Sequence, residues 1–312
     1  MTTAATNVPT SAGSGGWTVS ASPLWAVAAV LSLVCLWFWA PTGLLLLAFI
    51  AVIVFVHELG HLLLARRAGM KPTEFFWGFG PEVVAIERNG CRYGVKALFL
   101  GGYVKIWGMT PTSALPDGIE EADTYRAASH AGRLATILAG PLVNIAMAIA
   151  AFAAAEILDG ATVAAAIGTG FGMTWEVIAG TAQSLWLFAT NVGGYVGATF
   201  NTDAEAPVRF MSPVSQAELT GHVVESGVAM SLRWFAILSC AIGAINLVPL
   251  PPLDGAHAIV AAGEKLGQIV RRDPSVRFDV RRLEPVAYLT IAVLVTLSVS
   301  ALVMDIQDVR GL

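Results

Sequence analysis

Charged side chains are scarce in this chain. Asp, Glu, Lys and Arg make up 13% of its 312 residues, whereas 56% of the residues are hydrophobic. A soluble domain usually carries about 25% charged residues. The composition therefore excludes an ordinary soluble domain and favours a membrane protein. The formal net charge is only −4, and we expect no nucleic-acid partner.

Cysteine is also rare, and basic residues are missing from the start of the chain. The three cysteines, Cys35, Cys91 and Cys240, form no CxxC pair and no even set, which excludes a disulfide framework and a cysteine-built metal site. The polar stretch Met1–Gly16 has no Lys or Arg, which argues against a cleavable signal peptide. We predict a disordered tail over 1–22 and a single domain over 23–312.

Long apolar runs are what the chain has instead. A helix that crosses a bilayer core needs about 20 apolar residues. The first run is short and ends at Pro41, so it is either a tilted span or a helix that leans on the second. The predicted fold is an α-helical polytopic membrane protein with about five transmembrane helices and a small membrane-associated β-hairpin region. The predicted spans are about 24–40, 44–66, 134–158, 229–248 and 285–304.

The distribution of cations gives the chain an expected orientation. Nine Lys and Arg residues lie within 66–133 and six within 251–285, but 134–227 holds Arg209 alone. Loops rich in Lys and Arg stay in the cytoplasm. We therefore predict a multi-pass inner (cytoplasmic) membrane protein with an extracytoplasmic insert over 159–228. No internal repeat is evident, which counts against an inverted-repeat transporter.

Two segments between these runs have their own patterns. The glycine-punctuated alternation of CRYGVKALFLGGYVKI, within 75–109, predicts β-hairpins. The segment 171–200 is apolar but interrupted by polar residues. A membrane crossing there would place the two cation-rich segments on opposite sides of the membrane. We expect an interfacial or partly buried helix over 171–200.

The string VIVFVHELGHLLLARRAG, residues 52–69, places two histidines and a glutamate in a hydrophobic helix. His57 and His61 are four residues apart and project from one helix face. Two such imidazoles can bind one Zn²⁺, and Glu58 can then hold the attacking water and carry its proton. A chance pair of histidines at a helix end is the alternative. Three unpartnered polar groups at membrane depth are costly, so the location favours a metal site.

A catalytic zinc needs a third protein ligand and an open position. Asp254 follows the fourth run in NLVPLPPLDG, where the prolines cannot sustain a helix. By the cation count, Asp254 and His61 both lie toward the cytoplasmic side, where we expect the active site. His257 is a rival ligand that we expect to face the interface. The remaining histidines, expected at the surface, are His130 and His222.

Two asparagines at membrane depth also need partners. Asn144 lies in GPLVN inside the third run, and Asn246 lies at the end of the fourth. Each amide is either an interhelical hydrogen-bonding group or a direct participant in catalysis. In the second case it would donate to a peptide oxyanion or hold the substrate backbone.

Together, HELGH, GPLVN and NLVPLPPLDG occur in order, each at a hydrophobic run. This combination resembles the site-2 protease family of intramembrane zinc metalloproteases over about 44–304. The segment GFGPEVVAI…YGVKALFLGGYVKIWGM resembles the membrane-associated β-region of the bacterial sigma-factor-regulating branch. The resemblance implies one zinc per chain, with His57, His61 and Asp254 as ligands and Glu58 as the general base.

The resemblance also implies a substrate. Such enzymes cut a single-span membrane protein, often an anti-sigma factor, within the bilayer. The same resemblance implies that Asn246 engages the substrate, and we add Asn144 to the predicted substrate-binding residues. The GGYVK string, with Gly101, Gly102 and Tyr103, is expected to offer a strand edge to the extended substrate. Many members of the branch carry PDZ domains, but the insert here has about 70 residues, fewer than a PDZ fold would need.

Two other functions remain open on the sequence. A metal or proton-coupled transporter could use the same residues as a transit site, although it should have further acids along a path and Glu156 alone is weak support. A non-catalytic scaffold descended from a protease is the other, but it would have no use for Glu58 beside a metal.

Overall fold

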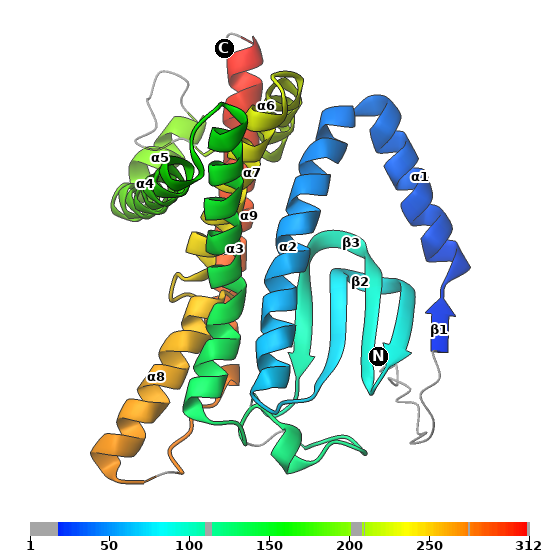
Figure 1. The fold of residues 1–312 in the computed structure, drawn as a ribbon, viewed down its shortest axis with the longest axis vertical. Helices are drawn as coiled ribbons and strands as arrows, with labels where there is room; N and C mark the ends of the chain where they lie inside the picture. The colour runs from blue at the N-terminus through cyan, green and yellow to red at the C-terminus, as the bar shows by residue number, and fades with distance from the viewer. Residues whose placement is uncertain (1–17, 110–113, 201–207, 209, 274, 311–312) are drawn as a thin grey trace.

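The computed structural model describes residues 18–109, 114–200, 208, 210–273 and 275–310. Figure 1 shows two groups of elements, a set of helices and a sheet beside α2. In chain order the elements are β1 (Thr18–Ala21), α1 (Pro23–Trp39), α2 (Pro41–Arg67), β2 (Pro72–Arg88), β3 (Cys91–Ile106), η1 (Glu121–Asp123), α3 (His130–Leu158), α4 (Val163–Thr190), α5 (Val192–Phe200), α6 (Pro213–Glu225), α7 (Val228–Asn246), α8 (Asp254–Arg271), η2 (Val280–Leu283) and α9 (Glu284–Arg310).

The predicted fold class is confirmed, because the described residues include five helices long and apolar enough to cross a membrane. They are α2, α3, α4, α7 and the segment Val280–Gln307, which includes α9. The predicted span over 24–40 is not among them. It forms α1, a helix of 17 residues that is shorter than the bilayer core requires.

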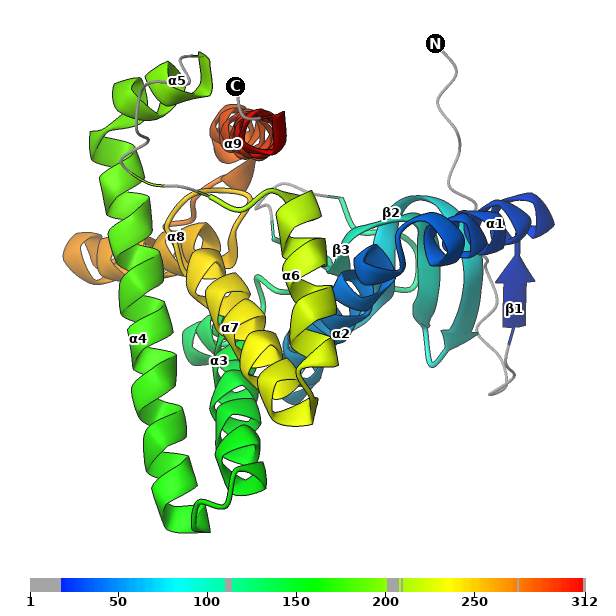
Figure 2. The same ribbon diagram turned by 90° about the horizontal axis from the view of Figure 1, so that it is seen from above.

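The fifth candidate span is α4 and not α1, and α4 runs in a different direction from α2, α3 and α9. Figure 1 looks along α4 nearly end-on while α2, α3 and α9 run vertically, and Figure 2 shows α4 lengthwise with α9 end-on. The expected single helix over 171–200 is wrong in its bounds, since α4 begins at Val163 and breaks at Asn191 before α5. The expectation that the segment 171–200 lies in the interface stays a prediction, and α4 is by length and composition a candidate span.

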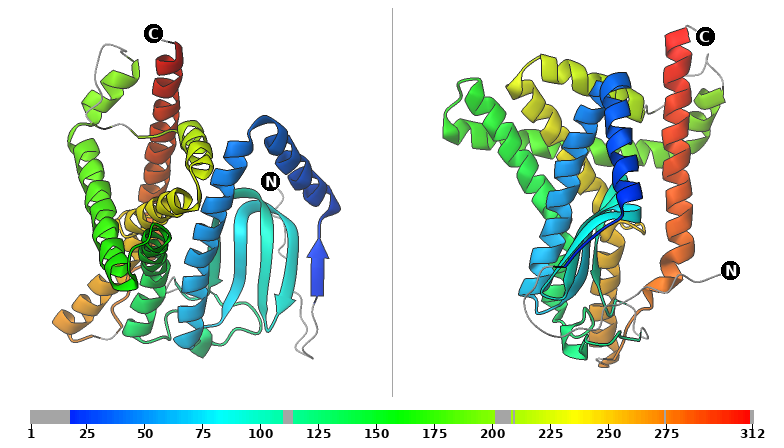
Figure 3. Two further views of the ribbon diagram at one scale, coloured as in Figure 1. Left: turned by 45° about the horizontal axis from the view of Figure 1, so that its top comes forward. Right: turned by 90° about the vertical axis from the view of Figure 1, so that its right-hand side faces the viewer.

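α3 is the central helix of the bundle and packs against α2, α4, α7 and α8. Glycines at the crossings let the backbones approach closely. A β-carbon at Gly60 of α2 would lie 3.0 Å from the Ala139 carbonyl oxygen, and one at Gly243 of α7 would lie 2.9 Å from that of Pro141. Figure 3 shows α2, α3 and α7 close together in both of its views.

The β-region folds into one antiparallel sheet in the order β1-β2-β3. Residues 74–77 of β2 have partners in both 92–95 and 102–105 of β3. The first part of β2 therefore lies between the two parts of β3, and 102–106 forms an edge of the sheet. β1 pairs with 84–87 at the other edge, so the prediction of disorder through residue 22 is wrong for Thr18–Ala21. Residues 1–17 lie outside the described residues.

The edge strand 102–106 runs beside α2 (Figure 1). The strand and the helix approach closely at Gly102, because a β-carbon there would lie 2.8 Å from Cγ of Glu58 and 3.3 Å from Cγ1 of Val54. Farther along, Val104 packs with the buried cluster of Leu62, Phe75 and Cys91. The hydrophobic face of the sheet thus fixes its edge against the helix that carries HELGH.

The proline-rich string after α7 is non-helical, as predicted, over residues 247–253. The helix resumes at Asp254 as α8, which packs on α3. Arg133 of α3 and Glu264 of α8 form a buried ion pair with an N···O distance of 2.7 Å. The backbone N–H of Phe278 also donates to Glu264. A buried ion pair that loses one partner is strongly destabilising, so this contact holds α8 in register with α3.

Candidate active site

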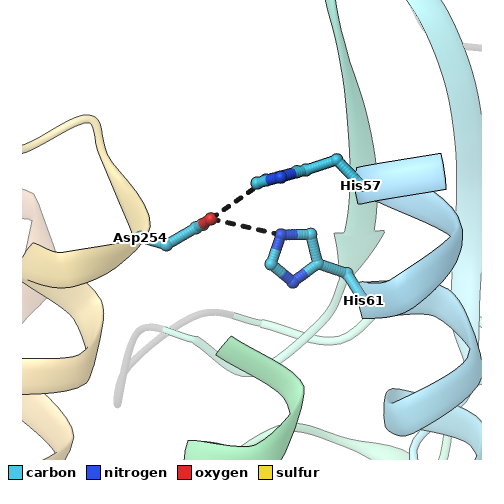
Figure 4. A group of neighbouring side chains, drawn as sticks. All are labelled: His57, His61 and Asp254. Atoms are coloured by element: carbon cyan, nitrogen blue, oxygen red, sulfur yellow. Dashed lines mark hydrogen bonds and ion pairs between the residues drawn. The ribbon is translucent and has the colours of Figure 1, made fainter. Parts of the chain in front are cut away.

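Two helices bring three possible metal ligands together. His57 and His61 project from α2 and Asp254 is the first residue of α8 (Figure 4). Nε2 of His57 lies 3.1 Å and Nε2 of His61 lies 3.3 Å from Oδ2 of Asp254. The ligand atoms all lie within 4.8 Å of one another. Residues separated by nearly two hundred positions therefore converge on a single point.

The distances suit a zinc ion. Zinc binds imidazole nitrogen and carboxylate oxygen at about 2.0–2.2 Å in a tetrahedral arrangement, so two of its ligand atoms lie about 3.3 Å apart. Both N···O distances are close to that value. Two imidazoles and one carboxylate are also the protein ligands of known catalytic zinc sites, where the fourth position stays open.

Gly140 of α3 leaves room for the ion. A β-carbon at this position would lie 2.4 Å from Nε2 of His61 and 2.6 Å from Nε2 of His57. These separations are only slightly longer than zinc–nitrogen bonds. A side chain at residue 140 would thus fill the space that an ion bound by both imidazoles needs, and glycine leaves that space open.

The far side of the His61 ring is held by the backbone of α3. Nδ1 of His61 lies 2.7 Å from the carbonyl oxygen of Thr136. A carbonyl only accepts hydrogen bonds, so Nδ1 carries the proton and donates. This arrangement leaves the lone pair of Nε2 free for a metal, as in most histidine–metal sites.

Asn144 holds the ring of His57. Its side-chain amide lies 3.1 Å from Nδ1 of His57, with Nδ2 on that side, while its Oδ1 is buried with no hydrogen-bond partner among the described residues. A neutral His57 that binds a metal through Nε2 carries its proton on Nδ1 and needs an acceptor there. Rotation of the Asn144 side-chain amide by half a turn supplies this acceptor, because Oδ1 then faces Nδ1 of His57. Asn144 can therefore set the tautomer of His57.

Glu58 lies next to His57 but is not one of the three converging groups. It is partly buried, and its Cγ faces Gly102 of the sheet edge. The carboxylate is thus enclosed between the metal-binding residues and the edge strand. Its role as the general base stays a prediction.

Other predicted site residues make contacts elsewhere in the fold. Asn246, at the end of α7, donates from Nδ2 to the carbonyl oxygen of Ile242 in its own helix. Gly101 has a φ of 141° and lies against the ring of Phe79. Tyr103 stacks on Phe76. Their proposed contacts with a substrate stay predictions.

Glu74 links two side chains on the sheet edge. Oε2 of Glu74 accepts a hydrogen bond of 2.6 Å from the Tyr103 hydroxyl, and Oε1 accepts one of 2.8 Å from Lys105. Burial alone would raise the pKa of Glu74, but these hydrogen bonds outweigh burial and lower it. Burial and the contact with Glu74 together raise the pKa of Tyr103. The Tyr103 hydroxyl is therefore committed to the sheet.

The three remaining histidines are outside the metal-binding group. His257 is partly buried on α8 and is not among the three converging groups. His222 is exposed, as predicted, but His130 is only partly exposed, and its Nδ1 is buried without a partner among the described residues. The surface prediction is therefore only partly correct for His130, because the first turn of α3 packs against neighbouring segments.

Comparison with known proteins decides the family. The family model described as peptidase family M50 matches residues 45–280, which include all three converging residues. The chain belongs to peptidase family M50. The resemblance to site-2 proteases is thereby confirmed, and this M50 peptidase is a zinc metalloendopeptidase of that type.

Relatives of this M50 peptidase carry matching names. A Rhizobium meliloti (strain 1021) protein with a provisional zinc metalloprotease name is 26% identical over 72% of this chain and 87% of its own length. A similarly named Mesorhizobium japonicum protein is 27% identical over 73% of this chain and 89% of its own length. Zinc metalloprotease Rip1 of Mycobacterium tuberculosis is 41% identical, but over only 35% of this chain and 27% of its own length.

The space at Gly140 generates a first prediction. In Gly140→Ala the methyl group competes with the ion for the same volume, so the purified protein should hold less than a tenth of the wild-type zinc. Atomic absorption spectroscopy measures this content. Gly180→Ala is the matched control, because nothing lies within 4 Å of a β-carbon at that position of α4. Full zinc content in Gly140→Ala would show that the ion lies elsewhere.

The contact between Asn144 and His57 generates a second prediction. Asn144→Leu removes the acceptor for Nδ1–H and should weaken zinc binding by about 10–100-fold. Asn144→Asp keeps an acceptor of the same size and should retain zinc. Competition with a fluorescent chelator measures both affinities. If the leucine variant bound zinc as tightly as the aspartate variant, Asn144 would have no part in orienting His57.

Proposed function

We propose that this membrane-embedded zinc metalloprotease hydrolyses a peptide bond within or next to the transmembrane segment of a single-span membrane protein, such as an anti-sigma factor. The observation that carries the proposal is the convergence of His57 and His61 with Asp254. The two histidines lie on α2, one of the helices apolar enough to cross a membrane. Hydrolysis is therefore expected at the depth of a substrate's own transmembrane helix.

The residues of the chain have separate parts in the proposed reaction. Bound Zn²⁺ supplies Lewis-acid polarisation of the scissile carbonyl and lowers the pKa of water. His57, His61 and Asp254 bind the metal, and Thr136 and Asn144 orient the two rings. The Glu58 carboxylate accepts a proton from the attacking water and returns it to the nitrogen of the leaving amine.

The substrate is proposed to bind as an extended chain along the sheet edge. Residues 102–106 pair on one side with β2, and the β-carbon direction at Gly102 turns one face of this strand toward Glu58 and Val54 of α2. A strand edge offers backbone N–H and C=O groups to an added strand. Strand addition would hold the scissile peptide open, because a helical carbonyl is already hydrogen-bonded. Gly101, Gly102 and Tyr103 belong to this proposed substrate site.

The two asparagines differ in the support they receive. Asn144 is buried against His57, which favours a role in orienting the ring over contact with the substrate. Asn246 keeps its proposed role in substrate engagement. It lies at the point where α7 gives way to the segment that leads to Asp254, so its side chain is suited to contact a chain that enters from this side.

The proposed cellular setting follows from the cations. Arg66 and Arg67 end α2, and His61 lies five residues earlier, about 7–8 Å above them along the helix. By the positive-inside rule this end faces the cytoplasm. We place the enzyme in the inner membrane with its active site toward the cytoplasmic side, and α4, α5 and α6 on the opposite side.

Neither alternative function explains the site as well. A transporter would need further ionisable groups along a path, and the described acids at the other end of α3, Glu156 and Asp159, are paired with Arg233 of α7. A scaffold would need neither Glu58 nor the orienting contacts of the histidines. Membership of a peptidase family with zinc metalloprotease relatives favours hydrolysis over both.

A third prediction tests the role of Glu58. Glu58→Gln keeps all three ligands but cannot accept a proton, so it should retain zinc and lose at least a thousandfold in cleavage of a labelled transmembrane peptide in liposomes. Mass spectrometry of the products measures cleavage. Zinc content serves as the control for folding. Cleavage at the wild-type rate by the zinc-loaded variant would refute the base assignment.

A fourth prediction tests the closeness of the sheet edge to the base. The methyl group of Gly102→Ala would push against Cγ of Glu58 and the carbonyl oxygen of Phe76. Small displacements of catalytic groups cost up to about 100-fold in rate, so turnover should fall more than tenfold with zinc content unchanged. Gly172→Ala, at an open position of α4, is the control. Wild-type turnover of Gly102→Ala would contradict the arrangement.

A further inference from the structure

The large aliphatic residues of α8 lie on its exposed side and not on its packed side. The buried residues are the small Gly255, Ala256 and Ala261 together with Glu264, and Gln268 is partly buried. The exposed side carries large aliphatic residues that recur at helical spacing and are 58–72% exposed. These exposed residues are Ile259, Leu266, Ile269 and Val270.

Cations border this apolar face. Lys265 lies beside it, and Arg271 and Arg272 close the helix. All three are exposed, and no ion pair is assigned to them within the described part of the chain. Glu264, the neighbour of Lys265, pairs with Arg133, whereas Asp273, which follows Arg272 and accepts hydrogen bonds from Ser275, also attracts Arg271. One acid thus offsets part of the charge of three cations, and the end of α8 keeps a positive surplus.

We propose that α8 lies in the membrane interface at the Arg66 end of α2, with its aliphatic face among acyl chains and its cations on anionic lipid headgroups. An amphipathic helix with basic residues along its apolar face binds such a surface by burial of its apolar area and by charge attraction. The occupant of the face is thus an acidic phospholipid leaflet.

The position of α8 in the fold favours lipid over a protein partner. α8 follows α7 and precedes α9, both apolar enough to cross a membrane, so it remains close to a bilayer at both ends. In Figures 1 and 2 its far half extends away from the bundle, and α3 is its main helical neighbour. Its exposed face has aliphatic residues but none of the Trp or Tyr residues that dominate protein-binding hot spots.

The proposed contact between α8 and anionic lipid would affect the metal site, because α8 itself carries a metal ligand. Asp254 is the first residue of α8, the Glu264–Arg133 pair fixes the middle, and the cations hold the end. Anionic lipid would therefore restrain the helix that presents the third ligand. We expect zinc to dissociate more slowly from the protein in a bilayer with acidic headgroups.

The first measurement locates the aliphatic face. Val270→Cys in a Cys35→Ser background is labelled with the environment-sensitive dye NBD in nanodiscs that contain 30% phosphatidylglycerol. Cys91 and Cys240 are buried and should not react. Emission should shift to the blue and resist aqueous quenchers, whereas Ser275→Cys, exposed beyond the helix, should report water. A water-exposed label at residue 270 would overturn the proposal. So would self-quenching between two labelled copies, because it would show that a second copy of the chain covers the face.

The second measurement tests the charge recognition without any cleavage assay. Replacement of Lys265, Arg271 and Arg272 by Gln should weaken retention of phosphatidylglycerol at least fivefold in native mass spectrometry, and should speed zinc release. The charge-preserving variant Lys265→Arg/Arg271→Lys/Arg272→Lys is the control and should behave as wild type. Equal lipid retention by the Gln variant, or equal zinc release from anionic and zwitterionic nanodiscs, would contradict the proposal.

Discussion

The free energy of placing ionisable side chains at membrane depth constrains this structure more than any other factor. His57, Glu58 and His61 lie on a helix of high hydropathy, where unpartnered polar groups are expensive. The structure compensates for each imidazole on both sides, with Asp254 at Nε2 of both rings and with Asn144 or the Thr136 carbonyl at Nδ1. A divalent cation between the rings and the carboxylate completes the compensation, because it satisfies two lone pairs and one negative charge at once.

α3 organises the site although it supplies no metal ligand. It provides the space at Gly140, the amide of Asn144 and the carbonyl of Thr136, all within three helical turns. It also holds α8 through Arg133 and Glu264. A change of register between α3 and either neighbour would therefore disturb ring orientation and the position of Asp254 together. Close glycine-mediated crossings with α2 and α7 make such a change difficult.

Much of this arrangement could be predicted from the sequence, because its signals are local. The spacing of HELGH fixes a shared helix face, and the prolines before Asp254 fix a break in the backbone at the right depth. The role of Thr136 could not be predicted, since its contribution is a backbone carbonyl that any residue possesses. Gly140 could be recognised as a site of close approach, but only the structure shows that the imidazoles approach it. The course of α4 and the pairing of β1 depend on tertiary contacts that no local pattern encodes.

X-ray absorption spectroscopy at the zinc edge of the purified protein in lipid tests the proposed metal ligands most directly. We expect a four-coordinate site with two imidazole nitrogens and carboxylate oxygen at about 2.0–2.2 Å, and loss of the carboxylate contribution in Asp254→Ala. A spectrum dominated by sulfur ligands, or one unchanged by removal of the Asp254 carboxylate, would contradict the claim that His57, His61 and Asp254 hold the metal.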